Sequence, residues 1–63
     1  MTPFFTAETT EGFSEPEIAI MNEAAAIIME RNPGIDRATV CDIINNAWSG
    51  GQTAAALTDS AGF

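Results

Sequence analysis

The sequence predicts an all-α fold, a small helical domain with two main helices, a short third helix and an N-terminal arm. Two stretches, 15–31 and 37–49, carry apolar side chains at helical spacing. A residue suited to capping a helix precedes each stretch, and a Pro-Gly turn separates them. We therefore expect two antiparallel or angled helices joined by a short turn.

The first helix has the clearest start signal. Ser14 stands three residues before Glu17, which is the spacing of a capping box. Phe13 and Ile18 are placed to touch as a hydrophobic staple, and Pro16 falls in the first turn, where its missing N–H costs nothing. A helix beginning at residue 15 follows from these signals.

The apolar side chains of this helix cover a wide arc of roughly 200° around its axis. The rest of the circumference holds Asn22, Glu23, Ala26 and Glu30. An arc of this width is more than one neighbouring helix can shield. We therefore expect the helix to be covered on more than one side.

The second helix is predicted to run from Arg37 to Ser49. Pro33 ends the first helix near Arg31, because proline pushes the preceding residue out of helical geometry. Asp36 can then cap the second helix. Gly50 is suited to the left-handed position that closes it.

The rest of the chain belongs to the same single domain, 1–63. Thr53 can cap a short helix near 54–58, which forms only if Leu57 docks, because so short a helix does not persist alone. Residues 59–63 are predicted to be coil. Residues 1–13 are predicted to form an extended arm, whose three phenylalanines either cover the first helix or fray with the terminus.

Length and composition limit how this domain is stabilised. A 63-residue chain buries only about 60% of its unfolded surface, so its stability is marginal. Cys41 has no partner for a disulfide, and the chain has no histidine to hold zinc. Self-association is the remaining support, and we expect a homodimer through Ile20, Ala24 and Ile27 of the first helix.

The chain is strongly acidic, with a net charge of −7. Six of the nine acidic residues, and neither arginine, lie in residues 1–30. This balance argues against nucleic-acid and membrane partners, because phosphate backbones are bound by Lys and Arg. With no leader pattern or apolar run long enough to span a bilayer, we expect a soluble, cytoplasmic protein.

Catalytic and metal-binding patterns are absent from the sequence. Glu23 and Glu30 share a face, but no calcium-loop or Glu-x-x-His motif accompanies them, so a solvated face is the simpler interpretation. Nucleophilic catalysis would lack a histidine base. We expect no enzymatic activity and no cofactor.

Two further features have more than one interpretation. The helix, turn and helix resemble the layout of a helix-turn-helix DNA reader with Arg37 opening the recognition helix, but two cations are few for phosphate contacts. Trp48 lies on the apolar stripe of the second helix and is either core or a binding hot spot.

The stretch FFTAETTEGFSEPEIAIMNEA resembles a recurring start among short uncharacterised open reading frames of proteobacteria and their phages. The matching residues are Phe4 or Phe5, Thr10, Glu11, Gly12, Phe13, Ser14, Glu17, Ile18, Met21 and Asn22. The resemblance implies a phage or prophage setting. By analogy of class it implies a small acidic inhibitor of a host protein, of the anti-CRISPR kind. No catalytic or binding residue is carried over from it.

The leading functional hypothesis is a non-enzymatic binding protein that docks on a basic surface of a partner, such as a nucleic-acid-binding protein. The residues expected to bind are Glu8, Glu11, Glu15, Glu23 and Glu30. Electrostatic complementarity of this kind speeds association and makes it salt-sensitive. The alternatives are a structural or scaffold homo-oligomer and, third, the helix-turn-helix regulator.

Overall fold

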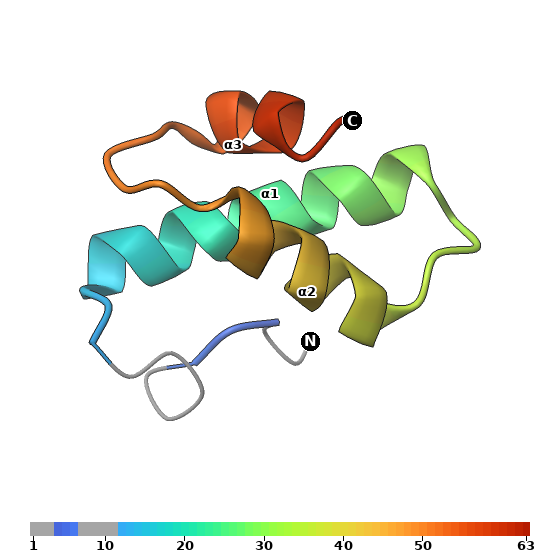
Figure 1. Ribbon diagram of the computed structural model, residues 1–63. Coiled ribbons are helices and arrows are strands. Elements are labelled where there is room, and N and C mark those ends of the chain that lie inside the picture. Colours follow the sequence, from blue (N-terminus) through green and yellow to red (C-terminus); the bar gives the residue numbers. More distant parts are fainter. Residues whose placement is uncertain (1–3, 7–11) are drawn as a thin grey trace.

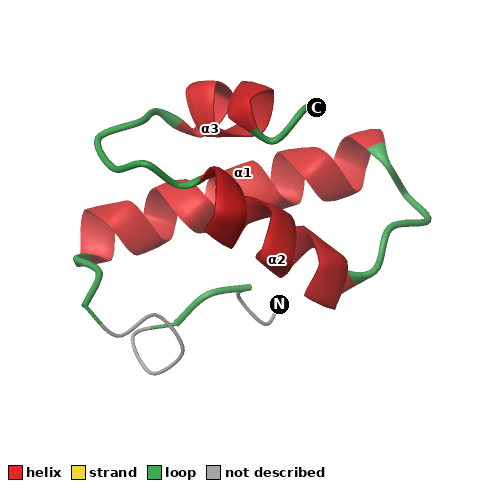
Figure 2. Cartoon of the chain, in the orientation of Figure 1, coloured by secondary structure: helices red, strands yellow, loops and turns green. Residues whose placement is uncertain are grey.

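The structure is a computed structural model that describes residues 4–6 and 12–63. Over this part of the chain it has three helices and no strand: α1 (Glu15–Arg31), α2 (Arg37–Ala47) and α3 (Ala54–Ser60) (Figures 1 and 2). The predicted all-α fold is confirmed. The bounds of α1 are those that the sequence predicts.

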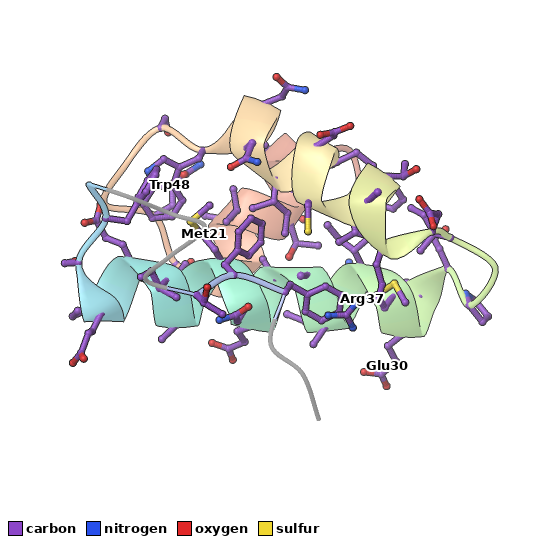
Figure 3. All side chains as sticks on the ribbon, turned by 90° about the horizontal axis from the view of Figure 1, so that it is seen from below. Met21, Glu30, Arg37 and Trp48 are labelled. Atoms are coloured by element: carbon purple, nitrogen blue, oxygen red, sulfur yellow. The ribbon has the colours of Figure 1, made fainter. Side chains whose placement is uncertain are left out.

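α1 is the long element against which the other parts pack. α2 returns across it at an angle, and α3 then lies along it (Figure 1). The described part of the arm, Phe4–Thr6, lies on the side of the α1–α2 pair opposite to α3, as Figures 1 and 3 both show. The wide apolar arc of α1 is therefore covered from several sides, as predicted, within one chain.

The core contains side chains from all three helices and from the arm. Its buried apolar residues are Phe5, Met21, Ala24, Ala25, Ile28, Val40, Ile44, Ala54 and Leu57. Thr58 is the polar residue among the buried ones, and its hydroxyl donates to the Ala54 carbonyl at 2.8 Å. No buried side-chain polar atom of residues 4–6 and 12–63 is left without a hydrogen-bond partner, which is the usual condition of a native core.

The helix starts follow the predicted caps. The predicted capping box is present, and the Ser14 backbone N–H donates to Glu17 Oε1 at 2.9 Å. The Asp36 carboxylate accepts the Thr39 N–H at 3.3 Å, and the Thr53 hydroxyl accepts the Ala56 N–H at 3.1 Å. Each cap satisfies a backbone donor that a helix start leaves free.

The turn between α1 and α2 uses a contact that the sequence analysis did not predict. The Asn32 backbone N–H and its side-chain amide both donate to the Ile28 carbonyl, at 2.9 and 3.1 Å. The amide thereby closes a carbonyl at the helix end, and Pro33 follows outside the helix. α1 ends at Arg31 for both reasons.

α2 ends at Ala47, two residues before the predicted end at Ser49. Trp48 leaves the helix in an extended conformation, and its ring packs edge-on against Phe13, with 5.8 Å between ring centroids. Gln52 completes the end: its side-chain oxygen accepts the Ser49 N–H at 2.9 Å. The prediction failed because Phe13, which is distant in sequence, packs against Trp48, and because Gln52, three residues on, accepts the Ser49 N–H outside the helix.

The structure also differs from the prediction at Gly50 and at the end of α3. Gly50 has the predicted positive φ, +86°, but it lies in the loop beyond Trp48 rather than directly at the end of α2. α3 extends to Ser60, so Asp59 and Ser60 are helical where coil was predicted. The two added residues belong to the same helix as Leu57, which is fully buried. This burial stabilises a helix that is too short to persist alone.

Candidate functional site

Three of the predicted partner-binding residues lie on one exposed side of α1. Glu15, Glu23 and Glu30 are exposed, with the exposed Ala19 and Ala26 between them. We call these five residues the acidic face. At 1.5 Å of rise per residue its two outer carboxylates are about 22 Å apart along the helix. Glu30 points away from α1 and α2, whereas Met21 lies between them (Figure 3).

The other two predicted binding residues, Glu8 and Glu11, lie outside the described residues. Glu17 is on α1 but has a structural role, because its carboxylate accepts from the Ser14 N–H and hydroxyl at 2.9 and 2.8 Å. These hydrogen bonds, first that of the backbone and then that of the hydroxyl, lower the pKa of Glu17 below its ordinary value.

Each arginine contacts one end of the described chain. The Arg31 guanidinium donates to the Phe63 carbonyl oxygen at 2.7 Å. The guanidinium carbon of Arg37 lies 4.1 Å from the centroid of the Phe4 ring, which is cation–π geometry. Both cations therefore contact a terminal segment.

The residues predicted for self-association differ in their availability. Ala24 is fully buried in the core of the single chain, so it presents no surface to a second copy in this fold. Ile20 and Ile27 are half-buried and pack against the core from its edge. Trp48 is half-buried too and packs against Phe13. It is therefore neither a fully buried core residue nor a fully exposed one, and both predicted interpretations stay open.

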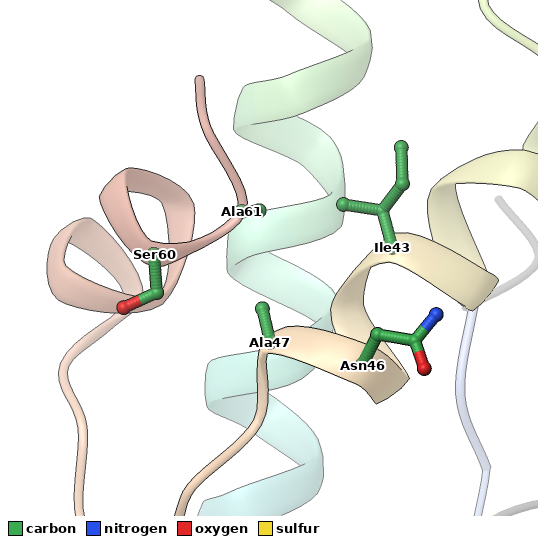
Figure 4. Close-up of a pocket in the computed structure, with 5 residues that line it drawn as sticks. All are labelled: Ile43, Asn46, Ala47, Ser60 and Ala61. Atoms are coloured by element: carbon green, nitrogen blue, oxygen red, sulfur yellow. The ribbon is translucent and has the colours of Figure 1, made fainter.

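A hollow lies between α2 and α3. Its volume is about 290 Å³, and it is lined by Ile43, Asn46, Ala47, Ser60 and Ala61 (Figure 4). The lining holds one amide and one hydroxyl, and neither acidic nor basic side chains. Such a lining can accept a small apolar group but offers no acid, base or nucleophile pair for catalysis.

Cys41 lies half-buried on α2, with its Sγ 3.8 Å from the Phe4 carbonyl oxygen. Burial raises the pKa of its thiol, with Arg37 acting in the opposite direction. A raised pKa leaves less thiolate, the reactive form of cysteine. Among the residues that the structure describes, no three His, Cys, Asp or Glu side chains gather as metal ligands would.

Asn22 has a role that the sequence analysis missed. Its side-chain oxygen accepts the Phe5 N–H at 2.7 Å, and its side-chain nitrogen donates to the Phe5 carbonyl at 3.0 Å. One amide thus binds both backbone groups of one arm residue. The sequence does hold one sign of this role, which is an asparagine in mid-helix beside the apolar arc. Asparagine is unfavourable inside a helix because its side chain tends to hydrogen-bond to backbone groups.

We compared the chain with protein-family models, curated sequences and solved structures, and none of the three comparisons found a match. Within the described ranges, no helix has both the length and the apolar character needed to cross a bilayer.

Proposed function

We propose that this chain is a non-enzymatic binding protein whose acidic face docks on a basic surface of a partner protein. The observation that supports the proposal is the exposure of Glu15, Glu23 and Glu30 along one side of a capped, 17-residue helix. The exposed Ala19 and Ala26 between them leave room for a partner to approach the helix closely. The basic surface of a cytoplasmic nucleic-acid-binding protein is the target that we would test first, with the chain acting as its inhibitor.

The physical basis is electrostatic. The helix fixes the backbone positions of the three glutamates, so binding does not have to order this part of the chain, and the entropy cost is limited to the side chains that meet. Complementary charge raises the association rate, and salt screens it over about 8–10 Å at ordinary ionic strength. Binding should therefore weaken as the salt concentration rises.

The test compares two variants with the same loss of negative charge. Glu23→Gln with Glu30→Gln neutralises two carboxylates of the acidic face, and Asp42→Asn with Asp59→Asn neutralises two exposed carboxylates elsewhere. Each tagged chain is used to capture proteins from host lysate at low and high salt. A basic nucleic-acid-binding protein should be captured by the wild type and by the Asp42/Asp59 variant.

The acidic-face variant should bind that partner roughly tenfold more weakly, about 0.7 kcal/mol for each lost charge pair. Added wild-type chain should also displace nucleic acid from the captured partner. Equal loss in both variants would show that only net charge matters, and the proposal for this face would then be wrong. Helical circular dichroism of both variants serves as the folding control.

The scaffold homo-oligomer is the second candidate, and the observation that favours it is the half-burial of Ile20 and Ile27 at the edge of the core. Under this alternative, the capture experiment would recover only further copies of the chain. Substituting Ile20 and Ile27 by Ser would then lower the mass in sedimentation equilibrium.

A further inference from the structure

The arm is attached to the helices by contacts that recognise an extended peptide. We call the surface beneath it the arm slot: Asn22 of α1, Arg37 and Cys41 of α2, and the buried cluster that receives Phe5. The Asn22 amide bonds both the N–H and the carbonyl of Phe5, at 2.7 and 3.0 Å. A residue in an antiparallel strand is held by its neighbour through the same two backbone groups.

The side chains of the arm add two further contacts. Phe5 is only 4% exposed and belongs to the same buried cluster as Met21 and Val40. The Phe4 ring lies under the Arg37 guanidinium, and its carbonyl faces the Cys41 thiol. The slot therefore has a backbone clamp, an apolar pocket for one aromatic residue and a cation for the preceding one.

The parts of the slot are far from the arm in sequence. The Phe5 bonds span 17 positions and the Phe4–Cys41 contact spans 37. The same segment from another copy could therefore make the same contacts. The residues between Thr6 and Ser14 can reach about 25 Å when extended, which is comparable with the 29 Å length of the molecule.

We propose that the arm slot is a peptide-binding site and that the arm of a second copy of this chain is its ligand in trans. Two copies then exchange arms, and each slot holds Phe4–Thr6 of the other copy. Exchange of an identical element is a low-cost route to a dimer, because every contact of the monomer is kept.

Charge favours this occupant over a face-to-face pair of helices. The chain carries a net charge of −7, whereas Phe4–Thr6 has no charged side chain. The segment that enters the slot therefore adds no negative charge there, although Glu8 and Glu11 follow it in the sequence. The dimer still carries twice the charge, so added salt should strengthen exchange, whereas it should weaken docking of a basic partner on the acidic face.

Complementation between two damaged chains tests the proposal. Asn22→Ala keeps a normal arm but damages the slot, and Phe5→Ala keeps the slot but damages the arm. The two variants are refolded together near 1 mM, the range of effective concentration expected for a short tether. Native mass spectrometry should find a one-to-one heterodimer, and neither variant alone should dimerise to a similar extent.

The control mixes Asn22→Ala with the double variant Phe5→Ala/Asn22→Ala. Both chains of this mixture carry the damaged slot, so no intact slot is present. No heterodimer should form. A heterodimer in the control, or none in the main mixture, would overturn the proposal. Neither substitution touches the acidic face, so failure here is distinguishable from failure of the proposed function.

A second measurement covers the case in which either variant fails to fold. Wild-type chains labelled with ¹⁵N and with ¹³C are refolded together at the same concentration. Exchange predicts isotope-filtered contacts between the Phe5 amide proton of one copy and the Asn22 side chain of the other, because the Phe5 N–H donates to the Asn22 side-chain oxygen. A mass that stays at 6.6 kDa without such contacts would show that the arm binds only its own chain.

Discussion

The arm and α3 are both short segments at the ends of the described chain, and both lie against α1, but they are attached in different ways. α3 has one large buried anchor, Leu57, and bonds its own backbone as a helix. The arm also has one large buried anchor, Phe5, but its backbone is extended. An extended backbone must find its hydrogen-bond partners outside itself.

Asn22 supplies that partner for the arm, which explains a polar residue next to the apolar arc of α1. α3 needs no such residue on α1, because the Thr53 hydroxyl accepts the Ala56 N–H, the Thr53 carbonyl accepts the Leu57 N–H and the later backbone groups bond within the helix. A helix can therefore dock through apolar contact alone. An extended segment needs both an apolar pocket and a polar clamp.

The largest effect should come from removing the anchor of α3. Leu57→Ala should destabilise the protein by about 2–5 kcal/mol, because the side chain is fully buried and leaves a cavity. Leu57→Met, which nearly conserves volume, should cost less than about 1.5 kcal/mol. Urea denaturation of both variants measures the difference, and equal costs would mean that α3 is not held by packing at this position.

Much of the fold could be predicted because its determinants are local. The start of α1 depends on Ser14 and Glu17, three residues apart, and the turn depends on Pro33. The early end of α2 could not be predicted, because Trp48 is drawn out by Phe13 and its neighbour Ser49 is held by Gln52. The Phe13–Trp48 contact joins residues far apart in the sequence and exists only once the chain has folded. The Ser49–Gln52 bond is local, but the apolar spacing of the second helix does not indicate it.

The candidate site was predictable to a similar extent. Helical spacing places Glu15, Glu23 and Glu30 on one side of α1, and the structure leaves all three exposed. Spacing could not separate Ala24, which is buried, from the half-buried Ile20 on the same arc, because that depends on where the other parts of the chain pack against α1. Whether the acidic face binds a partner stays a prediction.

Removing the clamp of the arm should have an intermediate effect. Asn22→Ala deletes two hydrogen bonds to Phe5, each worth about 1 kcal/mol, while alanine recovers part of the loss through helix propensity. The expected cost is about 1–2 kcal/mol in urea denaturation, with faster hydrogen exchange at the Phe5 amide.

The neighbouring exposed residue provides the control for this measurement. Glu23 is exposed on the same helix, so Glu23→Ala should change stability by less than about 0.5 kcal/mol. If Asn22→Ala behaves like Glu23→Ala, the arm is held by the Phe5 side chain alone. The distinction between clamp and anchor would then disappear.

The smallest expected effect comes from the caps of α1 and α3. These two caps differ in their pH dependence, because Glu17 titrates and Thr53 does not. Glu17 holds the start of α1, after the arm, and its hydrogen bonds to Ser14 lower its pKa. The ionised form therefore stabilises the fold fully above the ordinary value of 4.5, and this stabilisation is lost as pH falls through the lowered pKa. The Thr53 cap of α3 has no charge to lose.

Thermal melts of the wild type and of Glu17→Gln should thus differ most at neutral pH and converge as the pH falls towards 2.5, since protonated Glu17 is as neutral as Gln. Titration of the other eight acidic residues is common to both proteins, so their difference isolates the charge of Glu17. Thr53→Ala should cost about 1 kcal/mol at every pH. A wild-type advantage over Glu17→Gln that persists undiminished at pH 2.5 would show that the charge of Glu17 has no part in holding α1.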